Sequence, residues 1–273
     1  MPVRWIVVGA LVAAASFVAL TMSDRGPLRA ESCSATVGET RTRVDLEQAR
    51  WASLMSAMAV ERGLPPRATT IAIATAFQES KVRNIDYGDR DSVGLFQQRP
   101  SQGWGSVEQI LDPVYAIGKF YDGLVQVPGY EDLEITVAAQ AVQRSGFPDA
   151  YAQHEDRSRA LASALRGFSP AAFSCSIDPT GPGDAADVAA DLDAAFGPLA
   201  ATVADDVVSV TPSGSPELIS AAGWSVAHYA VANASRLRIG SVSFEGRTWS
   251  ARESDAGWVA STATGPAVSI STG

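Results

Sequence analysis

The sequence has few of the residues that most often build metal sites and catalytic triads. Among its 273 residues there are two cysteines and two histidines. It contains no C-x-x-C pair, no H-E-x-x-H motif, no Walker loop and no G-x-G-x-x-G fingerprint. We therefore expect neither a metal centre nor a cofactor. His154 and His228 are interpreted as surface or capping residues.

Positive charge is also in short supply. Lysine and arginine number 21 against 30 aspartates and glutamates, which gives a net charge of −9. A nucleic-acid partner would require a basic patch, so this class of partner is not expected. Hydrophobic residues make up 46% of the chain and charged residues 19%, a composition typical of a packed globular protein.

Long apolar runs are limited to the N-terminus, where the eighteen residues from Trp5 to Met22 carry no charge. This length reaches that of a bilayer-spanning helix and also fits the core of a signal peptide. No small-x-small cleavage site is obvious after it, so we favour an uncleaved signal anchor over residues 1–24, followed by a polar stalk over 25–43. The expected location is the cell membrane, crossed once, with the bulk of the chain extracytoplasmic. If the signal is cleaved, the protein is secreted.

The two cysteines, Cys33 and Cys175, bracket the central part of the chain. Outside the cytoplasm, an even pair at the edges of a domain is typical of a disulfide bond. Closing a loop of this size contributes on the order of 5 kcal/mol in the chain-entropy model. The alternative is two unrelated buried thiols.

Helical patterns fill the chain between residues 44 and 168, and no strand pattern interrupts them. The segment from Ile71 to Phe77 is apolar on nearly every face, which predicts a buried central helix. Ser106 and Gln109 have the spacing of a capping box. The predicted fold class is mainly α, with a lysozyme-like helical domain over 44–175.

The composition changes after Cys175. A Pro/Gly/Asp-rich linker with an Ala/Asp helix covers 176–214, and a small α+β domain is expected over 215–273. The dipeptide Glu245-Gly246 predicts a hairpin turn, and "GWVASTA" and "AVSIST" are possible further strands. Core packing is the preferred interpretation of three tryptophans, over a ligand-binding face: Trp224, Trp249 and Trp258. This domain shows no catalytic equipment and is a candidate for docking a partner protein.

Glu79 stands at the end of the apolar helix, which we expect to finish near Ser80. Apolar neighbours and the partial negative charge of a helix C-terminus both raise the pKa of a carboxyl group. A carboxyl group that stays protonated near neutral pH is suited to general acid catalysis. Arg83, four residues further on, offers a rival interpretation in which Glu79 forms an ion pair, and periodicity alone favours that pair.

Glu79-Ser80 is followed fifteen residues later by Gly94-Leu95-Phe96-Gln97. This pattern resembles the first two motifs of the lytic transglycosylase family, which has a goose-type-lysozyme-like fold; Phe96 replaces the usual methionine. The resemblance covers roughly residues 45–170. It implies a helical fold with a groove for peptidoglycan glycan strands, and cleavage of the β-1,4 bond between N-acetylmuramic acid and N-acetylglucosamine. The stretch "DYGDRDSVGLFQQRPSQGWG" also resembles actinobacterial envelope proteins.

The resemblance implies that Glu79 protonates the glycosidic oxygen and then takes the proton of the muramyl 6-hydroxyl, which closes a 1,6-anhydro ring. The second motif places Gln97 in the groove, where its amide would bind the sugar. The remaining candidate substrate-binding residues around these motifs are Ser80, Gly94, Phe96, Gln98 and Trp104. The family's third motif carries a tyrosine close to the glutamate. Here Gln140 occupies its place, and either Tyr151 or the amides of Gln140 and Gln143 are expected to substitute for it.

Two alternatives remain open at this point. One of the aspartates Asp86, Asp89 and Asp91 could activate water and make the enzyme an inverting hydrolase, although a solvated acidic loop is the simpler interpretation. The other alternative is a catalytically inactive peptidoglycan-binding scaffold within an envelope or secretion assembly, since a fold alone does not establish chemistry.

Overall fold

The computed structural model describes residues 30–144, 148–179, 181–263 and 265–273, and Glu31–Gly273 forms one compact unit. The apolar run from Trp5 to Met22, and with it the predicted signal anchor, lies outside the described residues. Within the described ranges, no helix combines the length and apolar character needed to cross a membrane.

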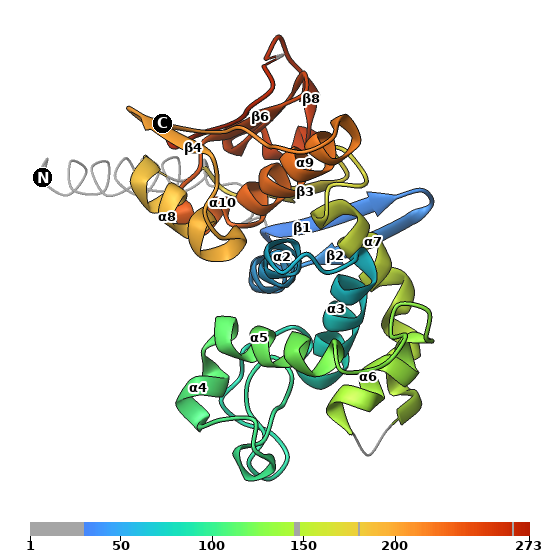
Figure 1. Cartoon of the computed structure of the whole chain (residues 1–273). Coiled ribbons are helices and arrows are strands. Elements are labelled where there is room, and N and C mark those ends of the chain that lie inside the picture. The colour runs from blue at the N-terminus through green and yellow to red at the C-terminus, as the bar shows by residue number, and fades with distance from the viewer. Residues whose placement is uncertain (1–29, 145–147, 180, 264) are drawn as a thin grey trace, which may run out of the picture. The chain divides into compact units, whose positions relative to one another are not determined.

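The elements follow one another as a short hairpin, a helical region, and a mixed region of helices and strands (Figure 1). The hairpin and the helical region comprise β1 (Ser32–Val37), β2 (Thr40–Val44), α2 (Leu46–Glu61), α3 (Pro66–Ser80), η1 (Pro100–Gln102), α4 (Val107–Leu111), α5 (Pro113–Leu124), α6 (Ile135–Gln143), η2 (Pro148–His154) and α7 (Glu155–Leu165). The mixed region comprises β3 (Phe173–Ser176), α8 (Ala185–Phe196), β4 (Ala201–Ala204), β5 (Val207–Val210), α9 (Pro216–Ala232), α10 (Ala234–Leu237), β6 (Ser241–Phe244), β7 (Arg247–Ser250), η3 (Ala251–Ala256), β8 (Val259–Ala260) and β9 (Val268–Ser271).

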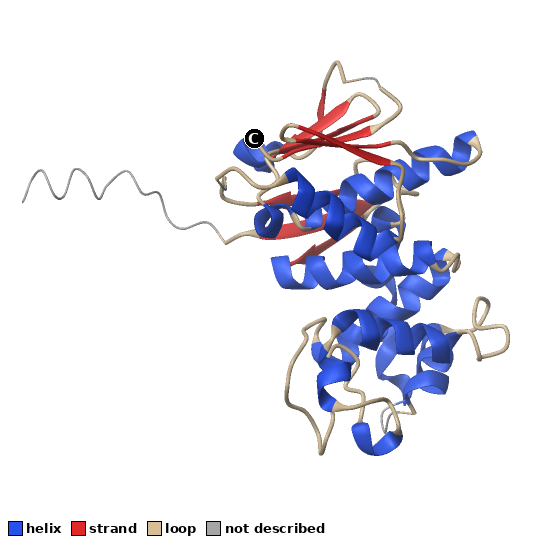
Figure 2. Ribbon diagram, turned by 60° about the vertical axis from the view of Figure 1, so that its left-hand side comes forward, coloured by secondary structure: helices blue, strands red, loops and turns tan. Residues whose placement is uncertain are grey.

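The predicted fold class, mainly α, is wrong. The described strands form two antiparallel sheets, one of three strands in the order β2-β1-β3 and one of six in the order β4-β5-β9-β6-β7-β8. Figure 2 shows the strands gathered toward one end of the compact unit and helices alone at the other. The small sheet escaped prediction because the buried positions of β1 are occupied by small residues, Cys33 and Ala35, which give a weak alternating signal.

The predicted disulfide is confirmed. Cys33 on β1 and Cys175 on β3 are directly paired across the small sheet, and their sulfur atoms are bonded. The two residues are 142 positions apart in sequence, so the bond ties the start of the helical region to the strand that follows it.

Helix α3 is the buried central helix that the sequence predicted, and every residue from Ala68 to Phe77 is buried. It packs against α7, α2, α6 and α5. The capping box of Ser106 and Gln109 at the start of α4 is confirmed, and Asp45 with Gln48 forms a second capping box at the start of α2.

Helix α9 packs against both sheets, and it also contacts α2 and α7. The tryptophans Trp224, Trp249 and Trp258 are all buried, as the core-packing interpretation predicted. His228 lies among them with no exposed surface, so its interpretation as a surface or capping residue is wrong. Its Nδ1 lies 2.7 Å from the carbonyl oxygen of Ala164, which provides a partner inside the core.

The hairpin predicted at Glu245-Gly246 is confirmed, because Phe244 on β6 pairs with Arg247 on β7. Glu245 and Gly246 both have positive φ, 44° and 71°, as a tight hairpin turn between twisted strands requires. The strands proposed within "GWVASTA" and "AVSIST" are also found, as β8 and β9.

Residues of the expected helical domain and of the expected C-terminal domain share one hydrophobic cluster. A buried hydrogen bond from Asn233 to Ser53, 3.2 Å long, is one of the links between α2 and the end of α9. The division into 44–175, 176–214 and 215–273 stays a prediction from composition.

Candidate functional site

Glu79 lies in the last turn of α3, which ends at Ser80 as expected. The next residue, Lys81, adopts the left-handed conformation with a φ of 59° and donates its backbone N–H to the Phe77 carbonyl. The Val82 N–H donates to the Ala76 carbonyl at 2.9 Å. These bonds satisfy carbonyls at the helix end and turn the chain away from the helix axis at the residue after Ser80.

The carboxyl group of Glu79 receives a hydrogen bond from the hydroxyl of Tyr151, with 2.6 Å between the phenolic oxygen and Oε1. Tyr151 belongs to the short helix η2 and is completely buried. Burial raises the pKa of Glu79, while hydrogen bonds from Tyr151 and from Gln143 oppose that rise. The net direction is upward, as the sequence predicted, so the group retains its proton to higher pH than an ordinary glutamate.

Arg83 does not follow the ion-pair interpretation. Its guanidinium contacts Asp45 and Glu47 at the start of α2, and the bond to Glu47 is 2.5 Å long. The helix has ended before Arg83, so the regular spacing that would bring it to Glu79 is lost. Glu79 is therefore left to Tyr151 and Gln143.

Ser80 and Gly94 hold the loop after α3 against the end of the helix. The Ser80 hydroxyl donates to the Leu95 carbonyl at 2.7 Å, and the Gly94 N–H donates to the Ile85 carbonyl at 2.7 Å. Gly94 has a φ of 79°, and a Cβ there would lie 2.8 Å from the Ile110 carbonyl oxygen. The position accepts only glycine without rearrangement.

Phe96 is fully buried and stacks on Phe120, with ring centroids 4.5 Å apart. Its carbonyl oxygen accepts a hydrogen bond from Nε2 of Gln143 at 2.5 Å. The Gly94–Gln97 motif is thereby linked through Gln143 to the carboxyl group of Glu79.

The two neighbouring glutamines make contacts within the protein. Nε2 of Gln97 lies 3.2 Å from the Tyr87 carbonyl oxygen and 3.3 Å from that of Gly94. Gln98 is 2% exposed and donates to the Ala116 carbonyl at 3.2 Å. Gln97 therefore connects two parts of the aspartate-rich loop through its side chain. Gln98 connects this loop to α5.

A cavity of about 670 Å³ opens beside this motif. Trp104 and Gln143 are both part of its wall, and Trp104 is half-buried. The other lining residues are Gln102, Gly103, Gly123, Gln126, Val127, Ala141, Val142 and Arg144. Gln140, half-buried one turn before Gln143 on α6, is not among them. Gln143 lowers the pKa of Glu79 and also lines the cavity, so it connects the carboxyl group to a space large enough for a sugar-sized ligand.

The aspartates of the loop are arranged differently from one another. Asp91 accepts hydrogen bonds from the Ser101 N–H, the Ser101 hydroxyl and Nε of Arg99, between 2.8 and 3.0 Å. These bonds hold the pKa of Asp91 well below its usual range. Asp89 is exposed and lies 3.9 Å from Arg90, a loose surface pair.

The role of Gln143 is only partly predictable from the sequence, which indicates it as one of the substitutes for the tyrosine. The structure brings both Gln143 and Tyr151 to Glu79. The sequence indicates a role for Gln143 through its spacing, because it lies three residues after Gln140 and is therefore its neighbour on the surface of the same helix.

Comparison with known proteins adds no family assignment. Neither the scan against protein-family models nor the search of curated proteins returns a match.

Proposed function

We propose that this protein cleaves the β-1,4 bond between N-acetylmuramic acid and N-acetylglucosamine in peptidoglycan, with Glu79 as its one catalytic carboxyl group. The observation that carries the proposal is the environment of Glu79. Its side chain is half-buried, the pKa of its carboxyl group is raised, and Tyr151 binds it at 2.6 Å. A general acid needs these properties near neutral pH.

In the first step, Glu79 donates its proton to the glycosidic oxygen as the bond from that oxygen to C1 of the muramyl residue breaks. Glu79 is then a carboxylate, and the hydroxyl of Tyr151 stabilises its charge. In the second step, the muramyl 6-hydroxyl attacks C1 and gives its proton to Glu79. The products are a 1,6-anhydromuramyl end and a free N-acetylglucosamine end, and Glu79 is again protonated.

The state of Asp91 favours this single-carboxylate route over an inverting hydrolysis. An inverting enzyme needs a second carboxylate with room for a water molecule between the two groups. The oxygens of Asp91 are engaged with Ser101 and Arg99. A carboxylate with so low a pKa is also a weak base toward water.

The cavity beside Trp104 and Gln143 is the proposed site for a sugar ring. An indole face offers a stacking surface, and an amide offers both a donor and an acceptor. Gln143 would thereby bind both the substrate and the catalytic group. Membrane anchoring through residues 1–24, with the remainder outside the cytoplasm, would give the protein access to this substrate.

Digestion of purified peptidoglycan by the full chain, followed by mass spectrometry of the released fragments, tests the proposal. Anhydromuramyl ends are the expected product. Reducing ends would assign the protein to the hydrolases and overturn the second step. Binding to peptidoglycan without any cleavage would instead support the inactive scaffold.

A further inference from the structure

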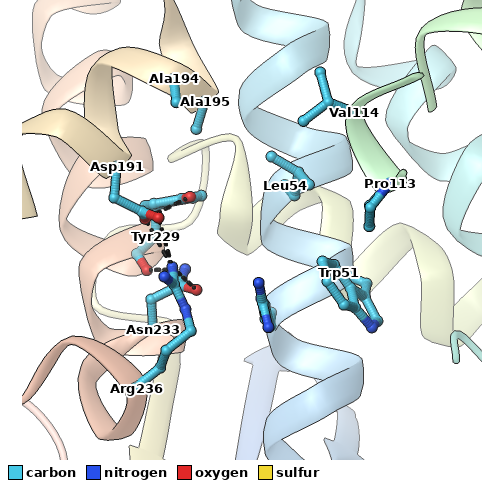
Figure 3. Close-up of a pocket in the computed structure, with 11 residues that line it drawn as sticks. Trp51, Leu54, Pro113, Val114, Asp191, Ala194, Ala195, Tyr229, Asn233 and Arg236 are labelled. Carbon is cyan, nitrogen blue, oxygen red and sulfur yellow. Dashed lines mark hydrogen bonds and ion pairs between the residues drawn. The ribbon is translucent and has the colours of Figure 1, made fainter. Parts of the chain in front are cut away.

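A second cavity has a volume of about 160 Å³ (Figure 3). Its lining includes neither Glu79 nor the residues that act on the Glu79 carboxyl group, Tyr151 and Gln143. Five elements contribute to its wall: α2, the first turn of α5, α8, α9 and α10. The lining residues are Arg50, Trp51, Leu54, Pro113, Val114, Asp191, Ala194, Ala195, Tyr229, Asn233 and Arg236. The volume is close to that of a cavity of about 150 Å³ known to hold a benzene ring.

One wall of this cavity is polar and held in place by hydrogen bonds. Asp191 accepts the Tyr229 hydroxyl at 2.9 Å and binds Nη2 of Arg236 through both carboxylate oxygens at 2.8 Å. Nη2 of Arg236 also lies 2.9 Å from the side-chain oxygen of Asn233. Figure 3 shows these four side chains on one side of the cavity, with Trp51 and Leu54 across from them. The polar wall is thus preorganised.

The lining of the cavity carries more positive than negative charge. Arg50 and Arg236 supply two guanidinium groups against the single carboxylate of Asp191. In the part of the chain that the structure describes, the guanidinium group of Arg50 has no ion pair or hydrogen bond, and it lies 4.2 Å from the centre of the Trp51 ring. All of the bonds given above for Arg236 involve Nη2, so its Nη1 and Nε remain available to an acceptor. Each guanidinium group presents up to five N–H donors in a fixed plane, a geometry that matches a carboxylate.

The opposite wall is mainly apolar, apart from the Arg50 guanidinium that lies over Trp51. Leu54, Val114 and Ala195 provide aliphatic surface, and the largely buried Trp51 provides aromatic surface. A ligand that fills the cavity therefore meets one guanidinium group on each side, from Arg236 and from Arg50, together with hydrocarbon from Leu54, Val114 and Ala195. Ligand sites commonly combine a mainly apolar lining with a few fixed polar groups in this way.

We propose that this cavity binds a carboxylate attached to a compact apolar body of about the size of one ring, with the carboxylate held by Arg50 and Arg236. The carboxylate neutralises the excess positive charge of the lining, and the apolar body displaces water from Leu54, Val114 and Ala195. Two sources present this chemistry: a free small carboxylic acid, and the carboxyl terminus of a peptide that ends in an apolar residue. The proposal does not depend on the function assigned to Glu79.

Isothermal titration calorimetry on the full chain tests this site. The probes are benzoate, its neutral analogue benzamide, and an acetylated dipeptide ending in phenylalanine, either as the free acid or as the amide. We expect at least one of the acids to bind at least tenfold more tightly than its amide. Tighter binding of the peptide acid than of benzoate would identify a chain terminus as the ligand, and the reverse order would identify a free acid.

Two variants assign the binding to this cavity. Arg50→Gln removes the guanidinium that has no protein partner and should weaken binding at least tenfold. Ala194→Leu places a longer side chain at the cavity and should weaken binding by occupying its volume, with both arginines intact. Arg41→Gln, at an exposed position on β2, is the matched control and should leave binding unchanged.

Equal binding of the acids and their amides would overturn the proposal, as would undiminished binding to both Arg50→Gln and Ala194→Leu. The absence of binding by either acid at millimolar concentration would also overturn it. Thermal melting of each variant checks that the fold is retained, and Ala194→Leu keeps the test decisive if Arg50→Gln unfolds.

Discussion

After burial, the hydrogen bond from the Tyr151 hydroxyl has the largest effect on the pKa of Glu79. Its hydrogen bond stabilises the carboxylate, so the bond lowers the pKa of Glu79 against the larger effect of burial. In Tyr151→Phe this opposition is removed, and the pKa of Glu79 should rise further. A hydrogen bond to a charged group contributes about 1.5–3 kcal/mol, so the rate of cleavage should fall roughly 10- to 100-fold.

The pH dependence of kcat/KM separates this role from a structural one. Because the acid form of Glu79 is the active form, activity is lost as pH rises through its pKa, and Tyr151→Phe should move this alkaline limb to higher pH. Tyr121→Phe is the matched control, since it removes another buried hydroxyl, which donates to the Met55 carbonyl at 2.8 Å. An alkaline limb that stays in place in Tyr151→Phe would contradict the assigned role.

His228 should make the stability of the protein depend on pH. Burial lowers its pKa from 6.5 to about 4, so the folded protein holds the neutral imidazole while the unfolded chain takes up a proton at higher pH. The contribution of neutral His228 to the free energy of unfolding is therefore fully present above about pH 6.5. It is lost as pH falls toward 4, which lowers the free energy of unfolding by on the order of 3 kcal/mol.

Urea unfolding across this pH range measures the effect. His228→Gln should flatten the decline, whereas His154→Gln, at the other histidine, should leave most of it. A decline of the same size in His228→Gln would show that another group is responsible.

At the level of residues, the sequence predicted the raised pKa of Glu79 and included Tyr151 among the candidate partners. It could not predict which partner is used, because Tyr151 approaches Glu79 from a separate short helix 72 residues later in the chain. The ion pairs of Arg83 could not be predicted either, since its partners Asp45 and Glu47 lie at the start of another helix.

The loop between α3 and α4 depends on Gly94 for its path. Gly94→Ala would combine a left-handed backbone with a Cβ 2.8 Å from the Ile110 carbonyl oxygen. We expect the free energy of unfolding to fall by roughly 3 kcal/mol, the sum of backbone strain and steric overlap. Cleavage should fall with it, since this loop positions the Phe96 carbonyl that binds Gln143.

Gly129→Ala is a matched control for this loop. Gly129 also has a positive φ, 67°, but a Cβ there would meet no atom within 4 Å. Its cost should be limited to backbone strain, about 1 kcal/mol. Equal losses of stability in the two variants, measured by chemical denaturation, would show that the contact with Ile110 has no consequence.

At the level of elements, the long helices and the strands β6 to β9 were predicted, and the strands β1 to β5 were not. Helix α3 is apolar on almost every face from Ile71 to Phe77, and Ser106 with Gln109 marks a helix start, so both signals are local. Strands β4 and β5 have only four residues each, and the Asp205-Asp206 turn between them lacks the glycine that marks the hairpin at Glu245-Gly246. The third strand of the small sheet, β3, lies more than 120 residues after β1 and β2, and no local pattern encodes that pairing.

The Cys33–Cys175 bond constrains the molecule as a whole, because it closes the chain around the helical region. Replacing both cysteines by alanine should lower the free energy of unfolding by about 2–5 kcal/mol. A reducing agent should destabilise the natural protein and leave the double variant unchanged. Mass mapping without reduction should recover the two cysteines in one cross-linked peptide pair, and two free thiols in protein taken from its native envelope would contradict the expected location.

The composition of the chain predicted the disulfide, but it could not predict how residues on either side of Cys175 share a core. The contacts that join the two parts of the chain connect residues far apart in sequence. One example is the 3.0 Å hydrogen bond from Trp249 to the Cys175 carbonyl. The aromatic cluster around Trp224 includes His228, whose partner Ala164 belongs to α7.

The central claim is that the neutral form of Glu79 performs catalysis, and Glu79→Gln tests it most directly. The amide has the shape of the acid but cannot donate a catalytic proton, so release of anhydromuramyl fragments should fall at least roughly 100-fold. The melting temperature should be unchanged or slightly higher, because a poorly solvated carboxyl group has been removed. Arg83→Gln serves as the control: it should cleave at nearly the natural rate and lose at most about 1 kcal/mol of stability. Mass spectrometry of peptidoglycan digested by the two variants gives the answer, and cleavage by Glu79→Gln at the natural rate would contradict the account.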